Sequence, residues 1–378
     1  MILEPKYELI RKLASEFAKK ELTREILDEV EETGVFPQYI LDKMAKAGFF
    51  GIKIPKSLGG QGADTLAYMI VMEEICRTSA VASLYISSAN SLSSGPLLTS
   101  GTKEQLDKYL TPIVTGKSKL CFALTEPGAG SDAASIQTYA QKCEGGYILN
   151  GRKCFITAAP LSDFAVIYAK TDKTAGVKGI SAFIVDMKSE GVSCGNPERK
   201  MGLIGCATSD IILENVFVPA ENLLGREGKG FVNAMKTLDV GRLGVAAQSL
   251  GVAQGCLDDS VKYVKERKQF GKHLKNFQTI RFTIADMATK IQAARELIYN
   301  AAVLIDKGIP CTSQCSMAKY FASEMCNEVA AKAVQLHGGY GYMKDYPIER
   351  RYRDCRVFTI YEGTSQVQQM VIANDILK

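Results

Sequence analysis

The run CFALTEPGAGSD, residues 121–132, marks the point at which the pattern of this sequence changes. It begins with apolar residues suited to a short strand and ends in residues typical of turns. Further short runs rich in β-branched and aromatic residues follow: YIL, RKCFI, DFAVIYAKTD, GISAFIVDM and DIILENVFVP. Asn150-Gly151 separates the first two of these and predicts a hairpin. Residues 119–226 are therefore expected to form a small β domain.

On both sides of this region, apolar residues recur at helical spacing. Within residues 1–118, one helical face carries Leu9, Ile10, Leu13, Phe17 and Leu22. Residues 227–378 contain three long helical runs, and the Ala-rich stretch GVAAQSLGVAQG allows helices to approach closely, as they do in a bundle. The expected order is a helical domain, a β domain and a helical bundle.

Composition excludes several classes of function. The net charge of +5 is small, and its basic residues are not clustered with aromatics, so no nucleic-acid partner is expected. The N-terminus lacks the apolar core of a signal peptide, and no apolar run is long enough to span a membrane. The eleven cysteines contain no CxxC pair and indicate free thiols in the cytoplasm. Two histidines offer little material for a metal site.

Three segments could bind a phosphate-containing ligand. TEPGAGSD exposes backbone N–H groups that could cradle a phosphate or a flavin edge, or it is an ordinary glycine-rich turn. QLHGGYGYMKDYPIERRYRD, residues 335–354, follows a helix rather than a strand, so it is no Rossmann fingerprint. ERKQFGK, residues 266–272, contains Arg267, which suits a bidentate phosphate contact or a solvated charged face.

A fourth segment, YEGTSQ at residues 361–366, holds the carboxylate of Glu362 between a tyrosine and a glycine. On its own, this hexapeptide is most simply a helix start, with Thr364 or Ser365 as the N-cap of the apolar run that follows.

Taken together and in this order, the four segments resemble the acyl-CoA dehydrogenase family, and the resemblance covers essentially the whole chain. Similarity is greatest to bacterial short-chain members that act on butyryl-CoA and to reductases of unsaturated acyl-CoAs. The resemblance implies an N-terminal helical domain, a middle β-barrel domain and a C-terminal four-helix bundle, assembled as a dimer of dimers. It also implies FAD between the β domain and the bundle, in a site completed by a neighbouring subunit.

The resemblance assigns expected roles residue by residue. Two segments are expected to contact the flavin: the first includes Phe122, Leu124, Thr125, Gly130 and Ser131, and the second is Phe155, Ile156 and Thr157. Contacts to the FAD of the partner subunit are expected from Arg267, Phe277, Gln278, Gln335, Gly338 and Gly339, and contacts to the dinucleotide from Thr364 and Gln366. Ser131, Asp239, Arg242 and Glu362 are expected to contact the acyl-CoA.

Glu362 is the expected catalytic base. Dehydrogenation needs a base for the Cα proton and a hydride acceptor for Cβ, and a carboxylate in a dry pocket has a pKa raised toward neutrality. Family members that place the base elsewhere use a position that corresponds here to Gly241, which has no side chain. Phe155 and Ala158 stand where the family often has tryptophan and asparagine, and Arg281 has no evident role.

The sequence therefore favours FAD-dependent dehydrogenation of a short-chain acyl-CoA, or the reverse reduction of an enoyl-CoA such as a crotonyl-, acryloyl- or aryl-acryloyl-CoA. The chain has no second nucleotide fold and no iron–sulfur or haem pattern, so an electron-transferring flavoprotein is the expected partner. The alternatives are an acyl-CoA oxidase, which is typically a longer chain, and a relative that binds ligands without catalysis.

Overall fold

The computed structural model describes residues 3–378, and its first part is helical, as predicted. The α-helices are α1 (Pro5–Glu21), α2 (Arg24–Thr33), α3 (Gln38–Lys46), α4 (Thr65–Cys76), α5 (Ala80–Ser87), α6 (Ser94–Ser100), α7 (Lys103–Gln105) and α8 (Thr111–Val114). Asp64 caps α4 by accepting a hydrogen bond from the backbone N–H of Ala67 at 2.9 Å. The same carboxylate accepts a 2.7 Å hydrogen bond from the hydroxyl of Tyr7, which ties α1 to the start of α4.

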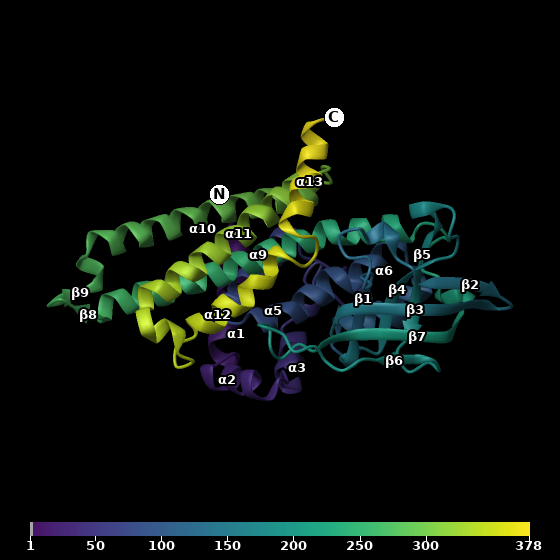
Figure 1. Ribbon diagram of the computed structural model, residues 1–378, viewed down its shortest axis with the longest axis horizontal. Coiled ribbons are helices and arrows are strands. Elements are labelled where there is room, and N and C mark those ends of the chain that lie inside the picture. Colours follow the sequence, from purple (N-terminus) through teal and green to yellow (C-terminus); the bar gives the residue numbers. More distant parts are fainter. Residues whose placement is uncertain (1–2) are drawn as a thin grey trace.

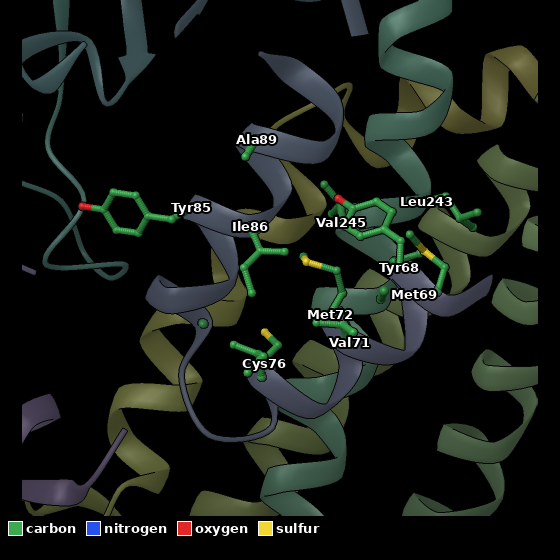
Figure 2. Close-up of a cluster of buried hydrophobic side chains, with 14 of the residues drawn as sticks. Tyr68, Met69, Val71, Met72, Cys76, Tyr85, Ile86, Ala89, Leu243 and Val245 are labelled. Carbon is green, nitrogen blue, oxygen red and sulfur yellow. The ribbon is translucent and has the colours of Figure 1, made fainter. Parts of the chain in front are cut away.

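Helices α4 and α5 lie at the centre of the main core. Every residue of α4 is buried, because the helix packs against α1 on one side and against the long C-terminal helices on the other. Figure 2 shows Tyr68, Met69 and Met72 of α4 beside Ile86 of α5, with Leu243 from a C-terminal helix next to them. This core joins the two helical parts of the chain.

The middle of the chain forms a seven-stranded sheet. Its strands are β1 (Leu120–Ala123), β2 (Tyr139–Cys143), β3 (Gly146–Thr157), β4 (Phe164–Lys170), β5 (Ile180–Asp186), β6 (Val192–Cys194) and β7 (Thr208–Pro219). The order is β1-β4-β2-β3-β7-β6, with β5 paired to β4. The sequence did not predict β2 and β6: β2 has no β-branched residue, and β6 has three residues.

The hairpin predicted at Asn150-Gly151 is wrong. Both residues lie inside β3, which continues through them with a register shift between Leu149 and Gly151. A Cβ on Gly151 would lie 2.4 Å from Oγ1 of Thr138, so glycine is needed here for a close approach of the backbone, not for a turn. The real hairpin joins β2 to β3, where Cys143 pairs with Gly146.

Long helices return after the sheet, again as predicted. They are α9 (Gly230–Glu266), α10 (Gln278–Asp306), α11 (Thr312–His337), α12 (Ile348–Cys355) and α13 (Ser365–Ile376). A two-stranded hairpin, β8 (Lys268–Gln269) and β9 (Lys272–His273), connects α9 to α10. A Cβ on Gly251 of α9 would lie 2.4 Å from the carbonyl oxygen of Glu73, which shows how closely α9 and α4 approach.

The arrangement in space confirms the expected helix–sheet–helix fold. Figure 1 shows the sheet at one end of an elongated molecule and β8 and β9 at the opposite end, with α9 running between them and packed against α10 and α11. Thr364 caps α13, as the sequence predicted, by accepting a hydrogen bond from the N–H of Val367. No helix among residues 3–378 is long and apolar enough to cross a membrane.

Candidate active site

Glu362 lies in the short connection between the 3₁₀ turn Arg356–Thr359 and α13. Its backbone has a φ of +52°, and the following Gly363 has a φ of +92°. A non-glycine residue in this left-handed region is strained by about 1–3 kcal/mol, and such residues persist where the surrounding structure holds them, often at functional sites. The conformation turns the Glu362 side chain toward α9.

The carboxylate of Glu362 meets α9 at Gly241. A Cβ at that position would lie 2.1 Å from Oε2 of Glu362, so only glycine leaves space for the acid. Oε2 is buried, and it has no hydrogen-bond partner among the described residues. Burial raises the pKa of Glu362 to about 7, although Lys319 and Arg242 act to lower it. A buried carboxylate with a free oxygen and a near-neutral pKa can give or take a proton at ordinary pH.

The predicted acyl-CoA contacts Asp239 and Arg242 lie one turn apart on α9 and pair with each other. The distance from Arg242 Nη1 to Asp239 Oδ1 is 2.8 Å, and Thr312 donates a 3.1 Å hydrogen bond to the other carboxylate oxygen. Arg242 is buried, and its Nε has no partner within the described part of the chain. Besides its ion pair with Asp239, Arg242 places a positive charge near Glu362 and acts to lower the pKa of that carboxyl.

Sequence reasoning missed the residues that hold the Glu362 loop. Lys319 of α11 is fully buried and donates a 2.7 Å hydrogen bond to the carbonyl of Gly363. The side-chain amide of Gln368 donates to the same carbonyl at 2.9 Å. The hydroxyl of Tyr361 donates a 2.7 Å hydrogen bond to Gln248 of α9. One sequence signal could have identified Lys319, which is a lysine on the Ala-rich face of α11. A lysine on such a buried face is expected to have a partner, because lysine is rarely fully buried without one.

The two segments predicted to contact the flavin lie side by side. The backbone N–H of Cys154 donates to the carbonyl of Thr125 at 3.0 Å, and Nζ of Lys153 donates to the carbonyl of Leu124 at 3.1 Å. These contacts bring the loop after β1, which includes Gly130 and Ser131, next to Phe155–Thr157 at the end of β3. The structure thus assembles this half of the predicted site within one chain.

A buried ion pair between Glu126 and Lys153 holds the loop after β1 in place. Glu126 accepts hydrogen bonds from Nζ of Lys153 at 2.7 Å and from the backbone N–H groups of Gln137 and Thr138 at 2.5 and 3.0 Å. Burial opposes ionisation of Glu126, but these donors outweigh it and lower its pKa. Burial lowers the pKa of Lys153 to about 8, against the attraction of Glu126. The pair leaves Gly128 and Gly130 at the surface, with open space where a Cβ would stand.

Phe155 is an exposed aromatic side chain in a strained position. It has a φ of +56° and is 67% exposed, while its neighbours Cys154 and Ile156 are buried. A register shift between Lys153 and Ile156 turns its ring outward, as bulges do beside active sites. Ala158, which has a φ of +60°, ends the segment. An exposed aromatic face beside an open glycine loop fits the flat aromatic ring of a flavin.

The residues predicted to contact the FAD of a partner subunit belong to segments around the β8–β9 hairpin. The guanidinium of Arg267 lies 5.3 Å from the ring centre of Tyr340, in the turn that includes Gly338 and Gly339. Phe277 immediately precedes α10, Gln278 is its first residue, and Gln335 is exposed near the end of α11. Tyr340, which sequence reasoning did not single out, is thus part of this cluster.

Within one chain, the two predicted groups of FAD-contacting residues lie far apart. Figure 1 shows β8 and β9 at the end of the molecule far from β1 and β3, so the hairpin that follows Arg267 is distant from the strand that contains Phe155. That separation agrees with the expectation that Arg267 and its neighbours serve the FAD of a partner subunit. Thr364 and Gln366 lie at the start of α13 beside Glu362, where Thr364 caps the helix and Gln366 is exposed.

Comparison with known proteins supports the same family. Models of the acyl-CoA dehydrogenase N-terminal, middle and C-terminal domains match residues 4–117, 121–216 and 228–377. The chain is 68% identical over its whole length to the caffeyl-CoA reductase-Etf complex subunit CarC of Acetobacterium woodii, of which it covers 100%. It is 57% identical to the 3-(aryl)acrylate reductase of Clostridium sporogenes, again with 100% of both chains covered.

A solved structure gives the same result in three dimensions. The butyryl-CoA dehydrogenase of Megasphaera elsdenii superposes with a TM-score of 0.96 at 41% identity, with 100% of both chains covered. The resemblance drawn from the four sequence motifs is therefore confirmed, together with the expected fold and the FAD cofactor. The chain belongs to the acyl-CoA dehydrogenase family, and it is an FAD-dependent oxidoreductase.

Proposed function

We propose that this protein adds or removes hydrogen across the Cα–Cβ bond of an acyl-CoA, and that its working direction is reduction of an enoyl-CoA with an aryl or short acyl group. The observation that carries the proposal is the buried carboxylate of Glu362, with one oxygen lacking a partner in the described chain and a pKa of about 7. The names of the relatives support the acyl class, because they act on caffeyl-CoA and on aryl-acrylates.

Glu362 exchanges the proton at Cα. In dehydrogenation, its ionised carboxylate takes this proton, and in reduction, its protonated form returns it. An acid–base group is most effective when its pKa is near the working pH, and about 7 suits both directions. Bound FAD supplies the hydride chemistry at Cβ. The backbone N–H of Glu362 is proposed to bind the thioester oxygen, which becomes more negative as the Cα proton is removed.

The remaining predicted residues hold the ligands. Phe155 and the loop from Phe122 to Ser131 bind and orient the flavin within one subunit. The cluster around Arg267 binds the FAD of a partner, so the working enzyme is an oligomer, proposed as a dimer of dimers. Asp239 and Arg242 orient the acyl-CoA. We place the enzyme in the cytoplasm, on the evidence of its eleven free cysteines.

An electron-transferring flavoprotein is the proposed redox partner. One relative is named as a subunit of a complex with such a protein, and within residues 3–378 no group of His, Cys, Asp or Glu could hold a metal that would carry electrons onward. The test mixes enzyme reduced by acyl-CoA with purified electron-transferring flavoprotein under anaerobic conditions and follows both flavins. Failure to transfer, alongside fast reaction with oxygen giving peroxide, would favour an oxidase instead.

The proton role is tested with Glu362→Gln. The variant should keep its FAD and fold but reduce its flavin about 10²–10⁴-fold more slowly with a saturated acyl-CoA, since it loses the general base. Stopped-flow flavin absorbance measures this rate across a panel of alkyl and aryl acyl-CoAs. Glu16→Gln is the matched control, because Glu16 lies on α1 with an exposed side chain. A near-wild-type rate for Glu362→Gln would overturn the assignment.

A further inference from the structure

Lys319 is a fully buried lysine to which no role in the proposed chemistry has been given. It lies in the middle of α11, with none of its surface exposed to solvent. Burying an ammonium group is unfavourable unless it is paired or hydrogen-bonded. Its hydrogen bond goes to the carbonyl of Gly363, directly after Glu362, at 2.7 Å.

This hydrogen bond supports a strained conformation. Glu362 and Gly363 both have positive φ, at +52° and +92°, and this turns the Gly363 carbonyl toward α11. Lys319 and Gln368 both donate to that carbonyl, so its direction is fixed from two sides. The side chain of Glu362 projects from the same two-residue turn toward Gly241. Fixing the carbonyl therefore also fixes the aim of the carboxylate.

Lys319 also places a positive charge beside the acid. Its pKa is lowered to about 8, first by burial and further by Arg242, while Glu362 and Glu324 act to raise it. In return, Lys319 is the foremost group that lowers the pKa of Glu362 against burial. The titratable and charged groups that interact electrostatically with Lys319 or Glu362 are Arg242 on α9, Glu324 on α11, Tyr361 on the loop and Tyr68 on α4.

We propose that Lys319 is a positioning residue for catalysis: its ammonium group anchors the turn that aims Glu362. Its positive charge also favours the ionised form of that carboxylate. This inference rests on the proposed role of Glu362. Lys319 touches the backbone beside the acid rather than the reacting atoms. Without its charge, Glu362 would stay protonated to higher pH, and dehydrogenation would then fail at neutral pH.

The test compares Lys319→Met, which removes charge and donor, with Lys319→Arg, which keeps both. In the wild type, the rate of flavin reduction by acyl-CoA should rise as Glu362 ionises near pH 7. The rising limb of this pH–rate profile should move about one pH unit or more to the alkaline side in Lys319→Met. The reason is that an opposite charge nearby shifts a pKa by about 1–3 units. The plateau in this variant should fall about ten- to a hundredfold, because the turn loses its anchor.

Lys319→Arg should keep the limb at its wild-type pH, whatever happens to its plateau. A merely structural lysine would change the plateau of all variants and leave the limb in place. Lys319→Gln provides a second neutral variant if Lys319→Met does not yield holoenzyme. Lys12→Gln is the control, since Lys12 has a 73% exposed side chain on α1. An unmoved limb in the neutral variants, or an equal shift in Lys319→Arg, would overturn the proposal.

A second readout does not depend on activity. Thermal unfolding from pH 5 to 9 compares each protein with its Glu362→Gln partner, and the pH at which the difference levels off reports the pKa of Glu362 in the fold. This pH should be higher by about one unit or more with Lys319→Met than with native Lys319. If unfolding shows that shift while Glu362→Gln reduces flavin normally, the charge effect holds and the base assignment fails. If unfolding shows no shift, the inference about Lys319 fails by itself.

Discussion

Substituting Gly241 by alanine should damage catalysis while leaving the fold intact. The new Cβ would lie 2.1 Å from Oε2 of Glu362 and 3.5 Å from the side chain of Leu92. Ordinary carbon contacts begin near 3.4 Å, so the carboxylate must retreat by about 1.3 Å. The carboxylate is the far end of a flexible side chain, and it can make this movement at little cost to folding. Alanine also favours a helix over glycine by about 1 kcal/mol.

The same movement is expensive for the reaction. A misplacement of about 1 Å in a catalytic group can lower a rate about 100-fold. We therefore expect Gly241→Ala to have a melting temperature equal to or above that of the wild type, full FAD content and a rate constant for flavin reduction lower by about two orders of magnitude. Anaerobic stopped-flow absorbance measures the rate, and calorimetry measures the melting temperature.

A matched control separates crowding at the acid from the general effect of a methyl group. Gly195 lies beside Asp210, where an added Cβ would make an ordinary 3.4 Å contact, so Gly195→Ala should be kinetically silent. A rate of flavin reduction close to that of the wild type in Gly241→Ala would contradict the expected crowding of Glu362. A loss of rate that comes only from loss of FAD would contradict it as well.

Further expectations concern the cofactor, the β domain and pH. Arg267→Ala should retain FAD about ten- to a hundredfold less tightly, measured after dialysis, and the loss should follow subunit dissociation. Lys153→Met should lower the free energy of unfolding by about 3–5 kcal/mol in denaturant titrations, because Glu126 is left buried without its partner. The stability advantage of Glu362→Gln over the wild type should grow as the pH rises from 4.5 to 7 and reach about 3 kcal/mol. In this range the carboxyl of the wild type ionises in the unfolded chain before it does so in the fold, and the folded state loses stability.

Each of these has a contradicting result. Unchanged FAD content in Arg267→Ala would remove the cross-subunit assignment. Wild-type stability in Lys153→Met would mean that Glu126 is solvated rather than held by the buried pair. A stability difference between Glu362→Gln and the wild type that does not vary with pH would mean that the carboxyl has an ordinary pKa.

The sequence predicted much of this molecule because its signals are local. Helical periodicity set the long C-terminal helices, and the Gly-Thr-Ser run of residues 363–365 set the start of α13. Asn150-Gly151 misled because the local preference for a turn was overridden by the pairing of β3 with β2 and β7. A glycine required by a close neighbour and a glycine required by a turn cannot be distinguished without that neighbour.

The surroundings of Glu362 could not be predicted for a similar reason. The acid itself was found through a motif, but the space for its carboxylate and one anchor of its turn come from residues more than 40 positions away. Gly241 on α9 makes space for the carboxylate, and Lys319 on α11 anchors the turn. Gly241 is an ordinary glycine on a small-residue face. Lys319 is an unusual lysine among alanines, but its helix alone does not say which group it would meet. Their roles follow from packing between helices.

The separation of the two groups of residues proposed to bind FAD has a genetic consequence. Consider a dimer formed from one Glu362→Gln subunit and one Arg267→Ala subunit. Because Arg267 serves the partner's flavin in the proposed assembly, both defects fall in the same one of the two sites, and the other site is built entirely from native residues. Co-expression of these two defective alleles should then restore activity in one site, whereas alleles carrying Glu362→Gln and Phe155→Ala, whose changes stay within their own subunits, should fail to complement each other.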